Sequence, residues 1–210
     1  MRDNVRTVVF AVVLALVCSL VLTATSLYTA PYRRANEKAE EVLNFLSALE
    51  VPIRAGADAE ALLNIFDKNV RRRKLGDLSL YEYVPEASSS GKPIAVAVPF
   101  SGPGLWGPID GVLALEPDLR TVRGIRFYKH EETPGLGGEI SADWFQKQFR
   151  GKKIIPGAGK HGLSILKSGS TLDENSVDGI TGATMTCDRV QAMLDGLAAA
   201  LEKERNGYVQ

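Results

Sequence analysis

The sequence predicts an α+β protein in which one N-terminal transmembrane helix precedes a single domain with an antiparallel sheet and flanking helices. A long apolar run near the start predicts the membrane helix, and four short β-prone segments lie between two helical patterns and a last amphipathic helix. This order of elements is typical of an α+β domain. The roughly 180 residues after the apolar run suffice for one core and are too few for two domains. We therefore expect an anchor over residues 1–31 and one domain over residues 32–210.

The apolar run is long enough to cross a membrane. Residues 7–32 carry no charged side chain, and the twenty residues of Val8–Leu27 would reach roughly 30 Å as a helix, the thickness of a bilayer's hydrocarbon core. A cleaved signal peptide is the alternative, but its apolar part usually runs about 7 to 15 residues. We expect a retained anchor in the lipid bilayer. Arg2, Arg6 and the amino terminus favour a cytoplasmic N-terminus and an exported domain.

The remaining elements follow from periodicity and turn residues. The predicted helices span Tyr32–Leu49 and Ala57–Asn69, the strands span Leu80–Val84, Ile94–Phe100, Gly111–Leu115 and Val122–Tyr128, and the last helix begins near Thr186. The basic run Arg71–Lys74 lacks interleaved aromatic residues and is interpreted as a solvated face. Gly157–His161 is interpreted as a loop rather than a phosphate-binding loop, because Ile154 stands where such a loop needs its first glycine.

Composition and charge exclude several functions. Basic and acidic residues number 25 each, so the formal net charge is zero, and nucleic acid, which needs a basic face, is not an expected partner. Cys18 and Cys187 lie far apart, and His130 and His161 have no second ligand at helical spacing. We therefore expect neither a disulfide nor a bound metal.

The most informative segment is Asp178-Gly179-Ile180-Thr181-Gly182-Ala183-Thr184-Met185-Thr186, immediately before the last helix. Gly182 and Ala183 leave room for a ligand to approach the backbone, and the start of a helix favours an anion such as a phosphate. The structural alternative is a helix N-cap made by Thr and Asp side chains.

This segment resembles the Asp-x-x-Ser/Thr-Gly-Ala-Thr flavinylation motif of the FMN-binding domain family, found in the C subunit of the sodium-translocating NADH:quinone reductase and in the G subunit of the Rnf complex. The resemblance implies that a flavin transferase joins FMN to Thr184 through a phosphoester bond. It also implies that Asp178, Thr181, Gly182 and Ala183 contribute to the cofactor site. Thr186 offers a second hydroxyl, and the register from Asp178 assigns the attachment to Thr184.

Two further segments resemble the same family. Glu132-Thr133-Pro134-Gly135-Leu136-Gly137 matches its Glu-Thr-Pro-Gly-Leu-Gly stretch, and Gly104-Leu105-Trp106-Gly107 is most similar to the branch formed by the reductase's C subunit. Pro134 fixes φ, while Gly135 and Gly137 permit positive φ and close backbone approach. The structural alternative is an ordinary turn before a helix near Asp143. The resemblance implies the following flavin contacts: polar contacts from Glu132 and Thr133, an apolar wall from Leu136, and Trp106 either on the flavin ring or in the core.

The resemblance implies a membrane-anchored flavoprotein subunit whose covalent FMN relays electrons within a sodium-translocating NADH:quinone reductase. The protein would need no catalytic acid or base of its own, because the flavin carries the redox chemistry. The other membrane subunits would be its partners, and the domain would lie on the periplasmic side of a bacterial inner membrane. The alternatives are an Rnf-type G subunit, a standalone membrane-anchored FMN-binding module, and an anchored adaptor without a cofactor.

Overall fold

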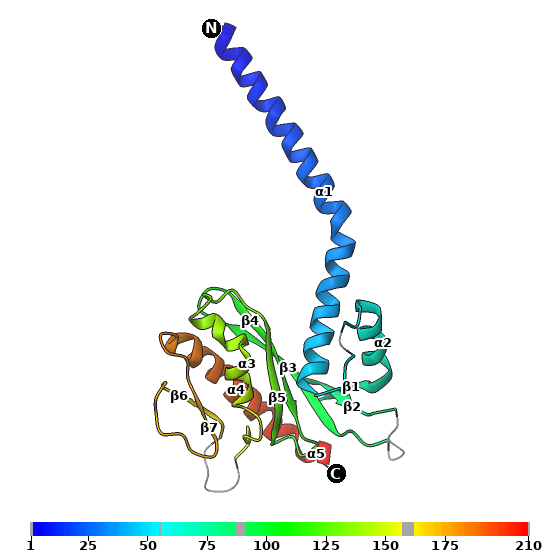
Figure 1. Cartoon of the computed structure of the whole chain (residues 1–210), viewed down its shortest axis with the longest axis vertical. Coiled ribbons are helices and arrows are strands. Elements are labelled where there is room, and N and C mark those ends of the chain that lie inside the picture. The colour runs from blue at the N-terminus through cyan, green and yellow to red at the C-terminus, as the bar shows by residue number, and fades with distance from the viewer. Residues whose placement is uncertain (1, 55, 87–90, 157–161, 210) are drawn as a thin grey trace. The chain divides into compact units, whose positions relative to one another are not determined.

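The computed structural model describes residues 2–54, 56–86, 91–156 and 162–209, which form two compact units, Met1–Glu40 and Glu41–Gln210. Figure 1 labels the elements in chain order. The helices are α1 (Arg2–Ala48), α2 (Ala59–Asn69), the 3-10 helix η1 (Gly137–Ser141), α3 (Asp143–Lys147), α4 (Thr184–Glu204) and α5 (Asn206–Val209). The strands are β1 (Val70–Leu75), β2 (Leu78–Tyr83), β3 (Ala95–Pro103), β4 (Pro108–Leu115), β5 (Val122–Lys129), β6 (Ser164–Leu166) and β7 (Ser176–Asp178).

Helix α1 contains the apolar run and continues through the expected helix Tyr32–Leu49 without a break. Within the described residues, it is the one helix long and apolar enough to cross a membrane, and its apolar window is 0% buried within the protein. Thr25 Oγ1 donates to the Val21 carbonyl at 2.8 Å, and Thr29 Oγ1 donates to the Thr25 carbonyl at 2.9 Å. These bonds satisfy the hydroxyl donors inside the helix, which lowers the cost of placing them in lipid.

The second unit is built on a five-stranded antiparallel sheet with the order β1-β2-β3-β4-β5. Alternate residues of a strand point to opposite faces, so Ala95 and Ala97 of β3 join one buried cluster while Val96 and Val98 join another. The register agrees, because Val96 is paired with Leu115 of β4, which belongs to the same cluster. The sheet is therefore buried on both faces.

Helices cover both faces of this sheet, which gives three layers (Figure 1). The end of α1 and α2 pack on one face, where Phe45 and Leu62 contribute to the core. On the other face α4 packs on β3 and α3 packs on β5, with Phe145 and Leu194 among the buried side chains. Asp58 caps α2 by accepting a hydrogen bond from the Ala61 amide at 2.8 Å.

Most predicted elements are confirmed, and three strands are additional. The four expected strands are β2 to β5, and the last helix begins at Thr184. The basic run Arg71–Lys74 forms most of β1, an edge strand whose four basic residues are exposed, and charged side chains on an edge discourage pairing with other chains. Strands β6 and β7 form a short parallel pair that the sequence did not indicate. The expected loop Gly157–His161 lies outside the described residues.

Candidate functional site

The segment from Asp178 to Thr184 connects β7 to α4 through a tight turn. Gly182 has φ +78°, a conformation that favours glycine, and Ala183 is the N-cap of α4. The alanine methyl group cannot accept a hydrogen bond from the first N–H groups of the helix. The interpretation of this segment as a Thr or Asp N-cap is therefore wrong. The first N–H groups of a helix have no partner within the helix. The start of α4 therefore presents backbone donors and the positive end of the helix dipole.

The two candidate hydroxyls of α4 lie in different environments. Thr186 is 1% exposed, and its Oγ1 donates to Oε2 of Glu132 at 2.6 Å. Thr184 is exposed and lines an open pocket of about 180 Å³. The Thr186 hydroxyl is therefore buried and already hydrogen-bonded to Glu132, whereas the Thr184 hydroxyl is accessible.

A second segment, Ile165–Ser168, forms the opposite wall of this pocket. Two motif side chains hold that wall: Asp178 Oδ1 accepts from the Gly169 amide at 3.0 Å, and Thr181 Oγ1 donates to Ser168 Oγ at 3.0 Å. Sequence reasoning missed this wall, because it consists of a three-residue strand and a turn with no distinctive pattern. The polar and reactive side chains it failed to place at the pocket are Lys167, Ser168, Cys187 and Asp188.

Cys187 lines the pocket from the first turn of α4, and its Sγ accepts from the Ile180 amide at 3.4 Å. Burial raises the pKa of the Cys187 thiol, and nearby Asp188 acts in the same direction against the Ile180 hydrogen bond. The thiol is therefore protonated at neutral pH and serves to hold the loop. No group of three metal-ligating side chains lies together in the part of the chain that the structure describes.

The loop after β5 contains the second motif and adjoins the first. Gly135 has φ +74°, as a tight turn requires, and the Thr133 carbonyl accepts from the Leu136 and Gly138 amides at 3.1 and 2.9 Å. Gly137 does not adopt the expected positive φ. A Cβ there would lie 2.5 Å from both Glu132 Oε2 and Thr186 Oγ1, so its role is close approach. The turn also leads into η1 and α3, as its structural alternative expects.

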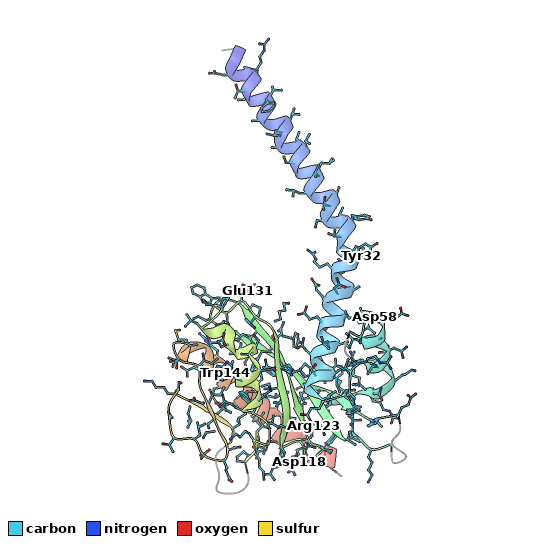
Figure 2. The ribbon with its side chains drawn as sticks, in the orientation of Figure 1. Tyr32, Asp58, Asp118, Arg123, Glu131 and Trp144 are labelled. Carbon is cyan, nitrogen blue, oxygen red and sulfur yellow. The ribbon has the colours of Figure 1, made fainter. Side chains whose placement is uncertain are left out.

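The structure places Glu132 in the interior and Trp106 at the surface. The Glu132 side chain is 5% exposed, and its carboxylate accepts hydrogen bonds from the protein itself. Trp106 is 68% exposed, so the alternative that it fills the core is wrong. Leu136 is 44% exposed and contacts the Gly182 turn. Glu131, the residue before Glu132, packs over Gly107 and lies at the end of the sheet where β5 leaves it (Figure 2).

The structure therefore brings the three predicted segments together. Leu136 contacts Gly182, and Glu132 bonds both the Leu105 amide and Thr186. The three segments that meet here form a face with four exposed apolar side chains: Leu105, Trp106, Leu136 and Met185. Such a face can accommodate an aromatic ring, while the start of α4 can bind an anion.

Solved structures with similar folds support the architecture. The crystal structure of Shewanella oneidensis NqrC superposes with a TM-score of 0.68 at 24% identity, covering 82% of this chain and 98% of that one. The crystal structure of the C subunit of the Na(+)-translocating NADH-quinone reductase from Parabacteroides distasonis gives 0.68 at 23% identity, covering 83% and 95%. These likenesses confirm the α+β fold.

Curated relatives match part of the chain. The C subunit of the Na(+)-translocating NADH-quinone reductase of Neisseria meningitidis is 42% identical over 119 residues, covering 57% of this chain and 44% of that protein. The corresponding protein of Vibrio anguillarum is 36% identical over 147 residues, covering 67% and 55%. The chain thus spans about half the length of these relatives. Residues 104–199, just under half of the chain, match the family model of the FMN-binding domain.

Proposed function

We propose that this chain is a membrane-anchored flavoprotein subunit that carries FMN in a phosphoester bond to Thr184 and relays electrons within a sodium-translocating NADH:quinone reductase. The observation that carries the attachment is the contrast between the accessible Thr184 hydroxyl and the buried, hydrogen-bonded Thr186 hydroxyl. The names of the relatives support the choice of complex over an Rnf-type complex.

The residues of the site fit the two ends of FMN. The pocket beside Thr184 measures about 180 Å³, less than the roughly 300–1,000 Å³ usual for a whole ligand. It therefore suits the phosphate and part of the ribityl chain, with the phosphate at the start of α4. The isoalloxazine ring would then lie outside the pocket, against Leu136 and Trp106.

The flavin supplies one- and two-electron transfer, and the residues of this chain bind and orient it. Asp178 and Thr181 hold the pocket wall, Gly182 allows the turn that presents Thr184, and Ala183 starts the helix. Thr133 and Gly135 shape the turn that places Leu136. No acid or base at the site is required for this role.

We further propose that residues 1–31 are the anchor, that residues 32–210 form the FMN-binding domain, and that this domain lies on the periplasmic side of a bacterial inner membrane. Helix α1 supports a single membrane crossing by its length and apolar surface. A flavin transferase would attach the cofactor on that side. The remaining subunits of the complex would be the electron donor and acceptor.

The test is to express the full chain in bacterial membranes with a flavin transferase and to measure in-gel flavin fluorescence and intact mass after denaturation. Thr184→Ala should abolish the denaturation-resistant flavin, whereas Thr186→Ser, which keeps the buried hydroxyl, should retain it. Absence of flavin from the parent would contradict the proposal. Retention in Thr184→Ala would move the attachment elsewhere.

A further inference from the structure

Glu132 lies where the three segments of the candidate site meet. Its Oε2 accepts from Thr186 Oγ1 at 2.6 Å, and its Oε1 accepts from the Leu105 and Trp106 amides at 2.6 and 3.3 Å. The residue is 5% exposed. Only the width of one carboxylate group therefore separates the first turn of α4 from the loop that carries Trp106.

Two glycines allow this convergence. A Cβ on Gly104 would lie 2.5 Å from Glu132 Oε1, and a Cβ on Gly137 would lie 2.5 Å from Glu132 Oε2. A side chain at either position would collide with the carboxylate. Both motif segments therefore approach Glu132 closely enough that only glycine is accommodated.

A buried carboxylate is costly unless hydrogen bonds compensate for its lost hydration. Here the three donors come from elements far apart in the sequence: the loop between β3 and β4, and α4. Each of these elements exposes an apolar side chain near its bond, since Trp106 is 68% exposed and Met185, next to Thr186, is 57% exposed. The Glu132 carboxylate thus holds the backbone of both elements beneath these exposed apolar side chains.

We infer that Glu132 is a positioning residue that joins the Trp106 loop to the first turn of α4 and so holds the Trp106 indole against the isoalloxazine ring of a flavin attached to Thr184. The flavin part of this inference rests on the proposed function, while the joining of the two segments does not. In this role Glu132 acts through its amide and hydroxyl partners and does not itself contact the ring.

The joining is tested without flavin, by hydrogen exchange of the Leu105 and Trp106 amides in the full-length protein in detergent. Glu132→Ala removes their acceptor, so both amides should exchange about tenfold faster or more, as expected when a hydrogen bond to a charged group is lost. Glu132→Gln retains one carbonyl acceptor and should restore most of the protection. Parental exchange in Glu132→Ala would overturn the inference.

The positioning is tested on the flavinylated protein through flavin fluorescence, which an indole in contact with the ring quenches. Trp106→Phe should raise the fluorescence of the native protein and so define the unquenched level, whereas Trp144→Phe should leave it unchanged. Thr186→Val removes the hydroxyl that bonds Glu132 and should raise fluorescence toward the Trp106→Phe level while the covalent flavin content stays parental. Thr186→Ser restores the hydroxyl and should restore quenching.

The two readouts separate this inference from the proposed function. A parent without covalent flavin would contradict the proposed function, and the amide exchange would still decide whether Glu132 joins the segments. Parental quenching in Thr186→Val, at full flavin content, would overturn the positioning role. Trp106→Phe without any rise in fluorescence would do the same.

Discussion

Leu136 packs against Gly182, so closely that a Cβ added to Gly182 would lie 3.0 Å from Leu136 Cδ2. This contact joins the turn that presents Thr184 to the loop that carries Glu132. It also means that Gly182 is constrained twice, by its φ of +78° and by its neighbour.

Gly182→Ala should destabilise the domain by about 1–2 kcal/mol, because an L-residue is strained at positive φ, and should also lower flavin attachment by displacing Leu136. The matched control is Gly151→Ala, away from the site, where φ is +77° and nothing lies within 4 Å of the added Cβ. Urea unfolding and in-gel flavin fluorescence measure the two effects. Equal flavin loss in both variants would show that backbone strain alone is responsible.

Asp178→Ala should loosen the pocket wall by removing the acceptor for the Gly169 amide. We expect a loss of about 0.5–1.5 kcal/mol in the free energy of unfolding, the usual net value of a hydrogen bond, together with slower flavin attachment. Asp178→Asn keeps a side-chain oxygen and should recover both. If the asparagine variant attaches flavin as slowly as the alanine variant, the charge of Asp178 matters rather than its hydrogen bond.

Asp118 should stabilise the turn between β4 and β5 in a pH-dependent manner. Its burial tends to raise the pKa, but hydrogen bonds from the Thr121 and Arg120 amides and the Thr121 hydroxyl outweigh burial and lower the pKa below 3.8. The stabilisation is thus fully present above pH 3.8 and is lost as pH falls through the lowered pKa of the folded state. Asp118→Ala should remove this acid dependence. The measurement is the midpoint of urea unfolding, determined at a series of acidic pH values. The control is Asp77→Ala, which removes an exposed aspartate.

Tyr128 should produce the opposite dependence at alkaline pH. Burial, followed by the nearby carboxylates of Glu41 and Asp110, raises the pKa of Tyr128 from 10.0 to about 12. The folded state therefore holds this proton more tightly, and its contribution to stability is present below pH 10 and is lost as pH rises toward about 12. Tyr128→Phe should flatten the fall in the urea midpoint between pH 10 and about 12. An unchanged slope would contradict this assignment.

The sequence was sufficient for the elements with a clear hydrophobic period. Strands β3 and β4 have apolar residues on both faces, and α4 has Val190, Leu194 and Leu197 at helical spacing, all buried. Strand β1 was missed because its central residues are Arg71–Lys74, which pair with β2 through the backbone. Strands β6 and β7 are three residues each, too short to show a period.

The candidate site was predictable in its motifs and not in its contacts. Counting the motif from Asp178 places its last threonine at Thr184, and the exposure of Thr184 is consistent with that choice. The hydrogen bond from Thr186 to Glu132 joins residues 54 apart in the sequence, and no local pattern encodes such a pair. The same holds for the wall formed by Ile165–Ser168, whose place beside Thr184 depends on the pairing of β6 with β7.

The most direct test of the flavin attachment is to locate the modified atom by peptide fragmentation of the flavinylated protein. Trypsin cleaves after Lys167 and Arg189, which releases Ser168–Arg189 with both candidate threonines. We predict that this peptide gains the mass of FMN less one water, and that its fragments place the gain on Thr184. An unmodified peptide, or a gain placed on Thr181 or Thr186, would contradict attachment at Thr184.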